Sequence, residues 1–183
     1  IAACPTAGSC GITAGVLTAL KDEMDLSDEI LINALITAGI IGEIISDKMA
    51  LAGAVAGCQA ECGVAAGMAA GAVCYIFGGK NADILNAAAL ALKNILGLTC
   101  DPVAGLVEIP CVKRNIFMAI HALVAAELSL AGVKSKIPLD EVIDAMKETG
   151  ELMVNSLKES SEAGLAKTKT GIETEAFLRQ KLE

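Results

Sequence analysis

Hydrophobic residues along this chain recur at the three- and four-residue spacing of amphipathic helices, and no segment alternates like a half-buried strand. Asp25 or Ser27 caps the second helix, Asn81 opens a later one, and Gly97 closes it. The pattern predicts helices over about 11–24, 28–48, 50–77, 81–96, 115–131, 138–146, 151–160 and 173–181. We therefore expect an all-α fold, a compact bundle of roughly seven to nine helices that forms one domain over residues 1–183, with a flexible C-terminal arm from about residue 162.

The longest apolar run, residues 50–77, is dominated by alanine and glycine. Its glycines recur at four-residue spacing on either side of a polar insert, residues 58–62, which read Cys-Gln-Ala-Glu-Cys. Such spacing places the glycines on one helical face and lets a neighbouring backbone approach closely. We expect a buried helix that is interrupted at the insert. The glycines are Gly53, Gly57, Gly63, Gly67 and Gly71.

Charge and hydropathy exclude some functional classes. The net charge of −8 argues against nucleic-acid binding, which needs a basic patch that the sequence does not show. Hydrophobic residues make up 54% of the chain and the mean hydropathy is +0.60, which raises the question of membrane spans. The two candidate stretches, 30–45 and 49–77, contain Glu43 and Glu61, and an acid in mid-span is costly. We interpret both as buried helices outside any membrane, and a membrane bundle of small-residue helices is the alternative.

The seven cysteines are odd in number and lack the spacing of a small secreted domain, and no signal peptide is visible, so we expect a reducing cytoplasm. Two of them, Cys100 and Cys111, bracket a segment that has Pro102 near one end and Pro110 at the other. Prolines disfavour a continuous helix, so this segment is predicted to be a shaped loop with a thiol at each end. Core packing does not require that combination, whereas a bound centre is one explanation for it.

The cysteines allow two interpretations. A single free cysteine is most often a small buried hydrophobe. Cys58, Cys100 and Cys111, however, all flank polar or proline-containing inserts in an alanine-rich background, which favours ligation. No C-x-x-C pair supports a structural zinc site, whereas an iron–sulfur cluster accepts thiolates from distant positions. Three thiolates on a four-iron cluster leave one iron open to a substrate.

The N-terminal turn and the Arg114 side chain could each contact an anion. Residues 6–9, Thr-Ala-Gly-Ser, feed the first helix, where free N–H groups suit a carboxylate or phosphate, although an ordinary N-cap turn is the simpler interpretation. Arg114 closely follows Cys111, and its planar fork suits either a bound carboxylate or an ion pair. His121, the single histidine, lies within a helical pattern and receives no role.

Three motifs carry a family resemblance. Residues 100–115, Cys-Asp-Pro-Val-Ala-Gly-Leu-Val-Glu-Ile-Pro-Cys-Val-Lys-Arg-Asn, resemble the signature of the iron–sulfur-dependent L-serine dehydratases, or L-serine deaminases. Residues 57–61, Gly-Cys-Gln-Ala-Glu, and residues 5–11, Pro-Thr-Ala-Gly-Ser-Cys-Gly, resemble further parts of that family. The resemblance covers nearly the whole chain and points to the α subunit or α portion of the enzyme.

The resemblance implies a 4Fe–4S cluster held by Cys58, Cys100 and Cys111, with the other cysteines outside the ligand set. It also implies deamination of L-serine to pyruvate and ammonia without PLP, with the open iron acting as a Lewis acid on the substrate hydroxyl. We expect the N-terminal turn to form part of the seat for the substrate carboxylate. The expected contacts are Thr6, Gly8 and Ser9, with Arg114 and Asn115 as the next candidates.

The family enzyme also needs a β portion, a subunit or a domain, and nothing in this chain resembles it. We expect the β portion to help complete the active site and to supply the general base, and we expect the protein to be oligomeric. Two rival hypotheses stand beside the serine dehydratase. One is a related cluster-dependent lyase that acts on cysteine or threonine, and the other is a catalytically silent helical module that only binds a partner.

Overall fold

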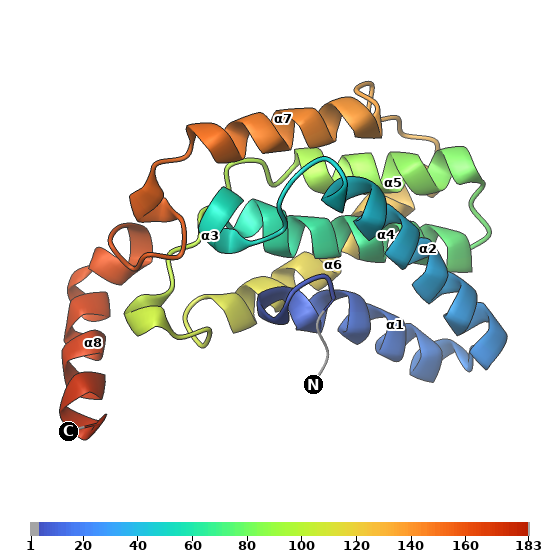
Figure 1. The fold of residues 1–183 in the computed structure, drawn as a ribbon. Coiled ribbons are helices and arrows are strands. Elements are labelled where there is room, and N and C mark those ends of the chain that lie inside the picture. The colour runs from blue at the N-terminus through green and yellow to red at the C-terminus, as the bar shows by residue number, and fades with distance from the viewer. Residues whose placement is uncertain (1–3, 183) are drawn as a thin grey trace.

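The computed structural model describes residues 4–182 as a bundle of helices (Figure 1). In these residues the chain contains no β-strand, and one isolated bridge joins Cys100 to Lys158. The predicted all-α class is confirmed. The helices are α1 (Cys10–Met24), α2 (Asp28–Ser46), α3 (Gly53–Ala56), α4 (Val64–Ile76), α5 (Asn81–Lys93), α6 (Cys111–Leu130), α7 (Leu139–Leu152) and α8 (Lys169–Leu182).

Helix α4 lies at the centre of the bundle and packs against α1, α2, α5 and α6 (Figure 1). All residues from Val64 to Cys74 are buried, and most of them are alanine or glycine. These short side chains let the neighbours come close: a Cβ added at Gly71 would overlap the Ile41 side chain, and one at Gly63 would overlap Ile95. The buried, glycine-faced helix that the sequence predicts is confirmed from residue 64 onward.

The polar insert breaks the predicted helix over 50–77 into separate pieces. The short helix α3 ends at Gly57, whose φ of 76° and ψ of 178° belong to a region that essentially only glycine adopts. One π-helical turn, Gln59–Gly63, then leads into α4. Such turns inside helices are rare and are frequent at functional sites.

The side chain of Gln59 fixes this π turn. It is completely buried, its Nε2 donates to the carbonyl of Met146 at 2.9 Å, and its Oε1 accepts the N–H of Gly97 at 2.9 Å. The backbone N–H of Gln59 donates in addition to the carbonyl of Leu98 at 2.9 Å. A buried amide with all of these partners holds the turn to α7 and to the loop that follows α5.

Gly57 should tolerate no side chain. Gly57→Ala is expected to lower the free energy of unfolding by about 2–4 kcal/mol, because alanine is strained at this φ and its Cβ would lie 2.8 Å from the carbonyl oxygen of Leu98. Urea unfolding followed by circular dichroism measures the change. Gly15→Ala is the matched control: Gly15 is exposed in α1 with no atom within 4 Å of an added Cβ, so this substitution should stabilise the protein by about 0.5–1 kcal/mol. Equal stability of the two variants would contradict the prediction.

Two predicted helix starts differ from the structure. Helix α6 begins at Cys111 instead of Asn115, because Pro110 occupies the N-cap position and its carbonyl accepts the first helical bond. The last helix, predicted over 173–181, begins earlier because the Thr168 hydroxyl accepts a backbone N–H of its first turn.

The helix predicted over 151–160 is wrong. Helix α7 continues to Leu152, and the chain then turns away through a short 3₁₀ turn at Asn155–Leu157. The backbone of residues 157–159 bonds to Cys100 instead of forming a helical ladder. A tertiary partner therefore replaces the local hydrogen bonds that the sequence pattern predicts.

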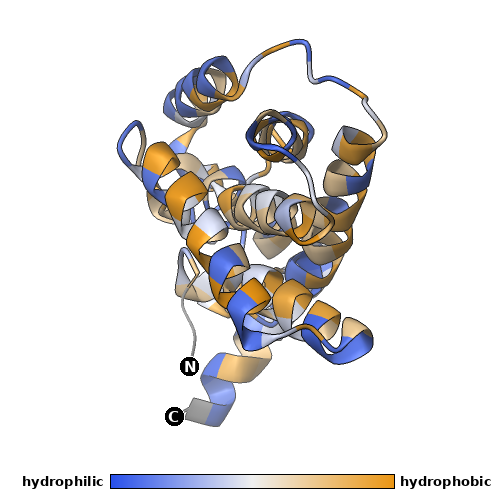
Figure 2. Ribbon diagram, turned by 90° about the vertical axis from the view of Figure 1, so that its right-hand side faces the viewer, coloured by the Kyte–Doolittle hydropathy of each residue, from blue (hydrophilic) through white to orange (hydrophobic). Residues whose placement is uncertain are grey.

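One helix of the described residues, α2, is long and apolar enough to cross a membrane. Only 28% of its most apolar window is buried, and a single helix of this kind is weak evidence for a membrane span. Figure 2 shows that apolar residues occur on outer helices as well as in the centre of the bundle. The second stretch considered in the sequence, residues 49–77, is broken at the π turn and largely buried.

Candidate metal centre

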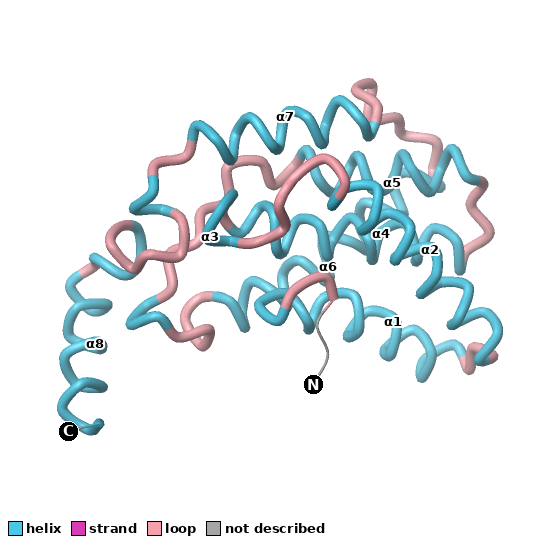
Figure 3. The backbone as a smooth tube through the Cα atoms, in the orientation of Figure 1, coloured by secondary structure: helices cyan, strands magenta, loops and turns pink. Residues whose placement is uncertain are grey.

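The segments α3, the loop after α5 and the start of α6 come together at one end of the bundle (Figure 3). Four buried thiols and one carboxylate lie there. The Sγ atoms of Cys58 and Cys100 and a carboxylate oxygen of Glu61 lie within 4.8 Å of one another. The thiols of Cys111 and Cys62 lie close enough to that of Cys58 to lower its pKa. The fold thus brings together the three cysteines that the sequence singled out, although they belong to separate segments, and adds Cys62 beside them.

The four thiols differ in the direction of their pKa shifts. Hydrogen bonds with Cys100, Cys111 and Cys62 lower the pKa of Cys58 far below its usual range, and the positive charge of Arg114 lowers it further. Hydrogen bonds to the Cys58 thiolate, and then burial, raise the pKa of the other three thiols. Thiolate sulfur is the donor that iron–sulfur clusters use, and a metal takes the place of thiol protons when it binds. The donor set therefore fits the expected cluster.

The loop that carries Cys100 and Cys111 reverses through a 3₁₀ turn at Val103–Gly105. Ala104 and Gly105 both have positive φ, 55° and 72°, and the N–H of Val103 donates to the carbonyl of Ile109 at 2.9 Å. These features return the chain to its starting point, so that the thiols at the two ends of the loop become neighbours. The shaped loop predicted from the two prolines is confirmed.

Arg114 is bonded within the protein. Its Nη2 donates to Oδ1 of Asp101 and its Nη1 donates to the carbonyl of Thr99, both at 2.8 Å. The two side chains of this ion pair are only 17% and 5% exposed. Burial alone would lower the pKa of Arg114, but the bond to Asp101 and the charge on Cys58 outweigh it and raise the pKa. Of the two interpretations that the sequence allowed, the internal ion pair is the one that the structure contains.

The C-terminal segment packs against the same loop. The N–H of Cys100 donates to the carbonyl of Leu157 at 2.9 Å, and the N–H of Glu159 donates to the carbonyl of Cys100 at 2.7 Å. Further along, the N–H of Leu165 donates to Oδ2 of Asp101 at 2.8 Å. The segment expected to be a flexible arm is thus in contact with the cysteine loop, and its mobility stays a prediction.

The N-terminal turn lies directly beside Glu61. The Thr6 hydroxyl donates to Oε2 of Glu61 at 2.7 Å and lies 3.0 Å from the Ser9 hydroxyl. Nδ2 of Asn115 donates to the carbonyl of Gly8 at 2.8 Å and so ties the turn to α6. The structure therefore places four of the five predicted substrate-binding residues at one edge of the thiol group, while Arg114 is occupied elsewhere.

Glu61 is the site residue that the sequence reasoning missed. Its pKa is raised chiefly by burial and also by the negative charge of Cys58, against the lowering effect of the Thr6 hydrogen bond. A signal was present, because Glu61 is the one acid in the apolar run over residues 50–77. That position was interpreted as evidence against a membrane span and not as a functional group.

A groove of about 530 Å³ runs between the N-terminal turn and α6 and opens on this centre, since Gly8, Cys111 and Asn115 line it. Along and beside the groove, α6 exposes a row of large apolar side chains, three of which line the groove. We call this row the α6 apolar face. Its residues are Val112, Ile116, Phe117, Ile120 and Val124.

Other candidate groups lie away from the centre. The Nε2 of His121 is 2.8 Å from the carbonyl of Ala91, which pairs it with α5. Burial raises the pKa of Cys74, in the second half of α4, to about 11, as expected for a packing cysteine.

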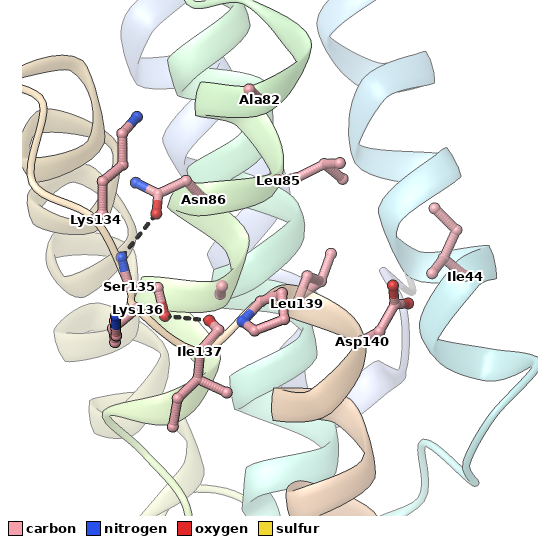
Figure 4. A pocket seen from close by; sticks show the side chains of 12 residues that line it. Ile44, Ala82, Leu85, Asn86, Lys134, Ser135, Lys136, Ile137, Leu139 and Asp140 are labelled. Carbon is pink, nitrogen blue, oxygen red and sulfur yellow. Dashed lines mark hydrogen bonds between the residues drawn. The ribbon is translucent and has the colours of Figure 1, made fainter.

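A second cavity of about 450 Å³ lies between α2, α5 and the start of α7 (Figure 4). The Asn86 and Ser135 groups that face it are bonded to each other and to the backbone of Ile137. Asn86 and Ser135 are thus satisfied within the protein.

An all-helical domain in which buried thiols converge beside a polar turn is a candidate cluster-binding domain of an enzyme. The family model described as serine dehydratase alpha chain matches residues 1–166, and the chain belongs to this family. It is 50% identical to a probable L-serine dehydratase alpha chain of Bacillus subtilis (strain 168), over 96% of this chain and 58% of that protein.

Two further relatives are also named L-serine dehydratases. The L-serine dehydratase alpha chain of Peptoniphilus asaccharolyticus is 45% identical over 93% of this chain and 59% of its own length. The L-serine dehydratase TdcG of Escherichia coli (strain K12) is 39% identical over 88% of this chain and 36% of its own length. The chain therefore spans less than two thirds of these three relatives.

Proposed function

We propose that the chain is the cluster-binding α portion of an L-serine dehydratase, which converts L-serine to pyruvate and ammonia. The observation that carries the proposal is the convergence of Cys58, Cys100 and Cys111 beside the N-terminal turn. These three cysteines would hold a 4Fe–4S cluster, which when bound supplies a Lewis acid for the substrate hydroxyl. The names of the relatives support the reaction and the assignment to an α chain.

The chain's own residues would bind and orient the substrate. The hydroxyls of Thr6 and Ser9 and the backbone around Gly8 form a polar turn at the edge of the thiol group, and they would hold the substrate carboxylate. Asn115 keeps this turn in place through its bond to Gly8. The charge of Arg114, whose fork is already bonded to Asp101, would stabilise the thiolates instead of contacting the substrate.

The general base would come from the β portion. The single imidazole of the chain is paired with α5, outside the site. Removal of the Cα proton by a base and departure of the hydroxyl give aminoacrylate, which becomes pyruvate and ammonia on tautomerisation and hydrolysis. These steps would need no PLP, because a bound cluster would supply the Lewis acid for the leaving hydroxyl.

The α6 apolar face is our candidate docking surface for the rest of the enzyme. It borders the groove that opens on the site, so a partner bound there would close the groove and could reach the substrate. The relatives have polypeptide beyond the region that this chain matches, which provides an occupant. We further propose a cytoplasmic, oligomeric enzyme, in keeping with seven free cysteines.

Anaerobic reconstitution with iron and sulfide tests the proposal. We expect about four irons and four sulfides per chain. The reconstituted chain, combined with the β portion, should form pyruvate from L-serine. 2-Oxobutyrate from L-threonine or sulfide from L-cysteine would identify the related lyases if either exceeds pyruvate formation. A full cluster without turnover of any of these substrates would indicate the silent module, and a requirement for detergent would indicate the membrane bundle.

A further inference from the structure

We propose that the Glu61 carboxylate is a fourth protein ligand of the cluster, at the iron that the three cysteines leave free. The carboxylate dissociates from this iron when the substrate binds. The inference rests on the proposed cluster and deepens it. It assigns a second state to the site, in which the chain itself protects the open iron while no substrate is bound.

Glu61 lies beside two of the proposed cluster ligands. A carboxylate oxygen of Glu61 lies within 4.8 Å of both the Cys58 and Cys100 sulfurs. Ligand atoms this close to one another can share one bound centre. Glu61 belongs to the π turn that the buried Gln59 side chain fixes. Its carboxylate therefore extends toward the thiols from an anchored backbone and not from a surface loop.

The backbone at Gly8 and Gly53 leaves space beside the thiols for the Glu61 carboxylate but not for a further side chain at either glycine. A Cβ at Gly53 would overlap Oε1 of Glu61, and a Cβ at Gly8 would lie 2.6 Å from its Oε2. Two glycines from distant segments thus leave room for one side chain next to the thiols. Glycine serves this purpose because it has no Cβ.

Glu61 also lacks a cationic partner. Among the described residues its carboxylate forms no ion pair, and the side-chain hydrogen bond that it accepts comes from Thr6. Glu61 is half-buried, so without a counter-charge its carboxylate carries a desolvation cost that a metal cation offsets.

Thr6 links ligand exchange to substrate binding. Its hydroxyl orients Glu61 in the structure and also belongs to the turn proposed to hold the substrate carboxylate. A substrate carboxylate at that turn would compete for this hydroxyl and release Glu61. No redox change is involved, because one oxygen donor replaces another.

The test is the rate at which the open iron is lost in the absence of substrate. Wild type, Glu61→Ala and Glu61→Gln chains are reconstituted anaerobically and exposed to limited oxygen, and the three-iron cluster is followed by its EPR signal. Without the carboxylate, we expect the three-iron signal to form at least about tenfold faster in both variants. L-Serine, which supplies an oxygen donor in place of the carboxylate, should slow iron loss in Glu61→Ala and change the wild-type rate little.

Glu159→Gln is the matched control. Glu159 is exposed, and its charge acts on both Glu61 and Cys100 through space, so its loss tests electrostatics without removing a ligand. It should behave like the wild type. An unchanged rate of iron loss in both Glu61 variants would overturn the inference, and loss of turnover alone would make Glu61 a proton carrier instead. A wild-type chain that assembles no cluster would overturn the proposed function itself.

Discussion

Serine in place of Cys100 is expected to abolish the cluster. The Sγ of Cys100 lies within 4.8 Å of Cys58, and a hydroxyl cannot replace a thiolate as a soft ligand. Iron and sulfide per chain should fall to background after anaerobic reconstitution. Serine turnover by the complete enzyme should fall by about 10³-fold or more, because Lewis-acid activation contributes several kcal/mol to lowering the barrier. Cys58→Ser and Cys111→Ser are expected to behave alike.

Two other cysteines provide the controls. Cys74→Ala removes a buried thiol that packs in the second half of α4, and Cys62→Ala removes one that bonds to Cys58 but lies outside the expected ligand set. Both variants should retain full iron and sulfide content. A normal cluster in Cys100→Ser would remove that residue from the ligand set, and loss of the cluster in Cys62→Ala would add Cys62 to it.

Asp101→Ala is expected to destabilise the fold by about 3–5 kcal/mol. The substitution leaves the buried guanidinium of Arg114 without its carboxylate partner, and a buried unpaired charge is costly. It also removes the acceptor for the N–H of Leu165. Urea unfolding of the protein without cluster measures this directly, since metal binding then does not contribute to the difference.

Comparison with an exposed pair isolates the effect of burial. Arg179 and Glu175 form an ion pair one turn apart on α8, where the arginine side chain is 76% exposed. Glu175→Ala should cost only about 0.3–0.5 kcal/mol. A double-mutant cycle of Asp101→Ala with Arg114→Met should show that the two effects are strongly coupled. The interpretation is wrong if Asp101→Ala is no more harmful than Glu175→Ala.

The sequence predicted the helical class because the spacing of apolar residues determines which face of a helix is buried. It also predicted the cysteine loop, since Pro102 and Pro110 restrict the local backbone whatever the fold. Interactions between distant residues were out of reach. The bond from Thr6 to Glu61 joins the N-terminal turn to the π turn, and no local pattern signals such a pair.

Interactions between distant residues also explain what the sequence left open for Arg114 and predicted wrongly for residues 151–160. Whether Arg114 faces a ligand or an internal acid depends on where the loop returns Asp101. The helix predicted over 151–160 does not form because its backbone finds a partner in Cys100, far away in the sequence. Local propensity is a weak prior that tertiary contacts override.

The bridge between Cys100 and Lys158 has a consequence for the order of events during synthesis. A ribosome releases the chain from the N-terminus, so all of the sulfur donors emerge before the residues that bond to the backbone of Cys100. The final position of this thiol is therefore set only after the segment around Leu157 has been made. Any machinery that delivers iron to this protein meets a finished site only after residues 157–159 have been made and have folded back onto Cys100.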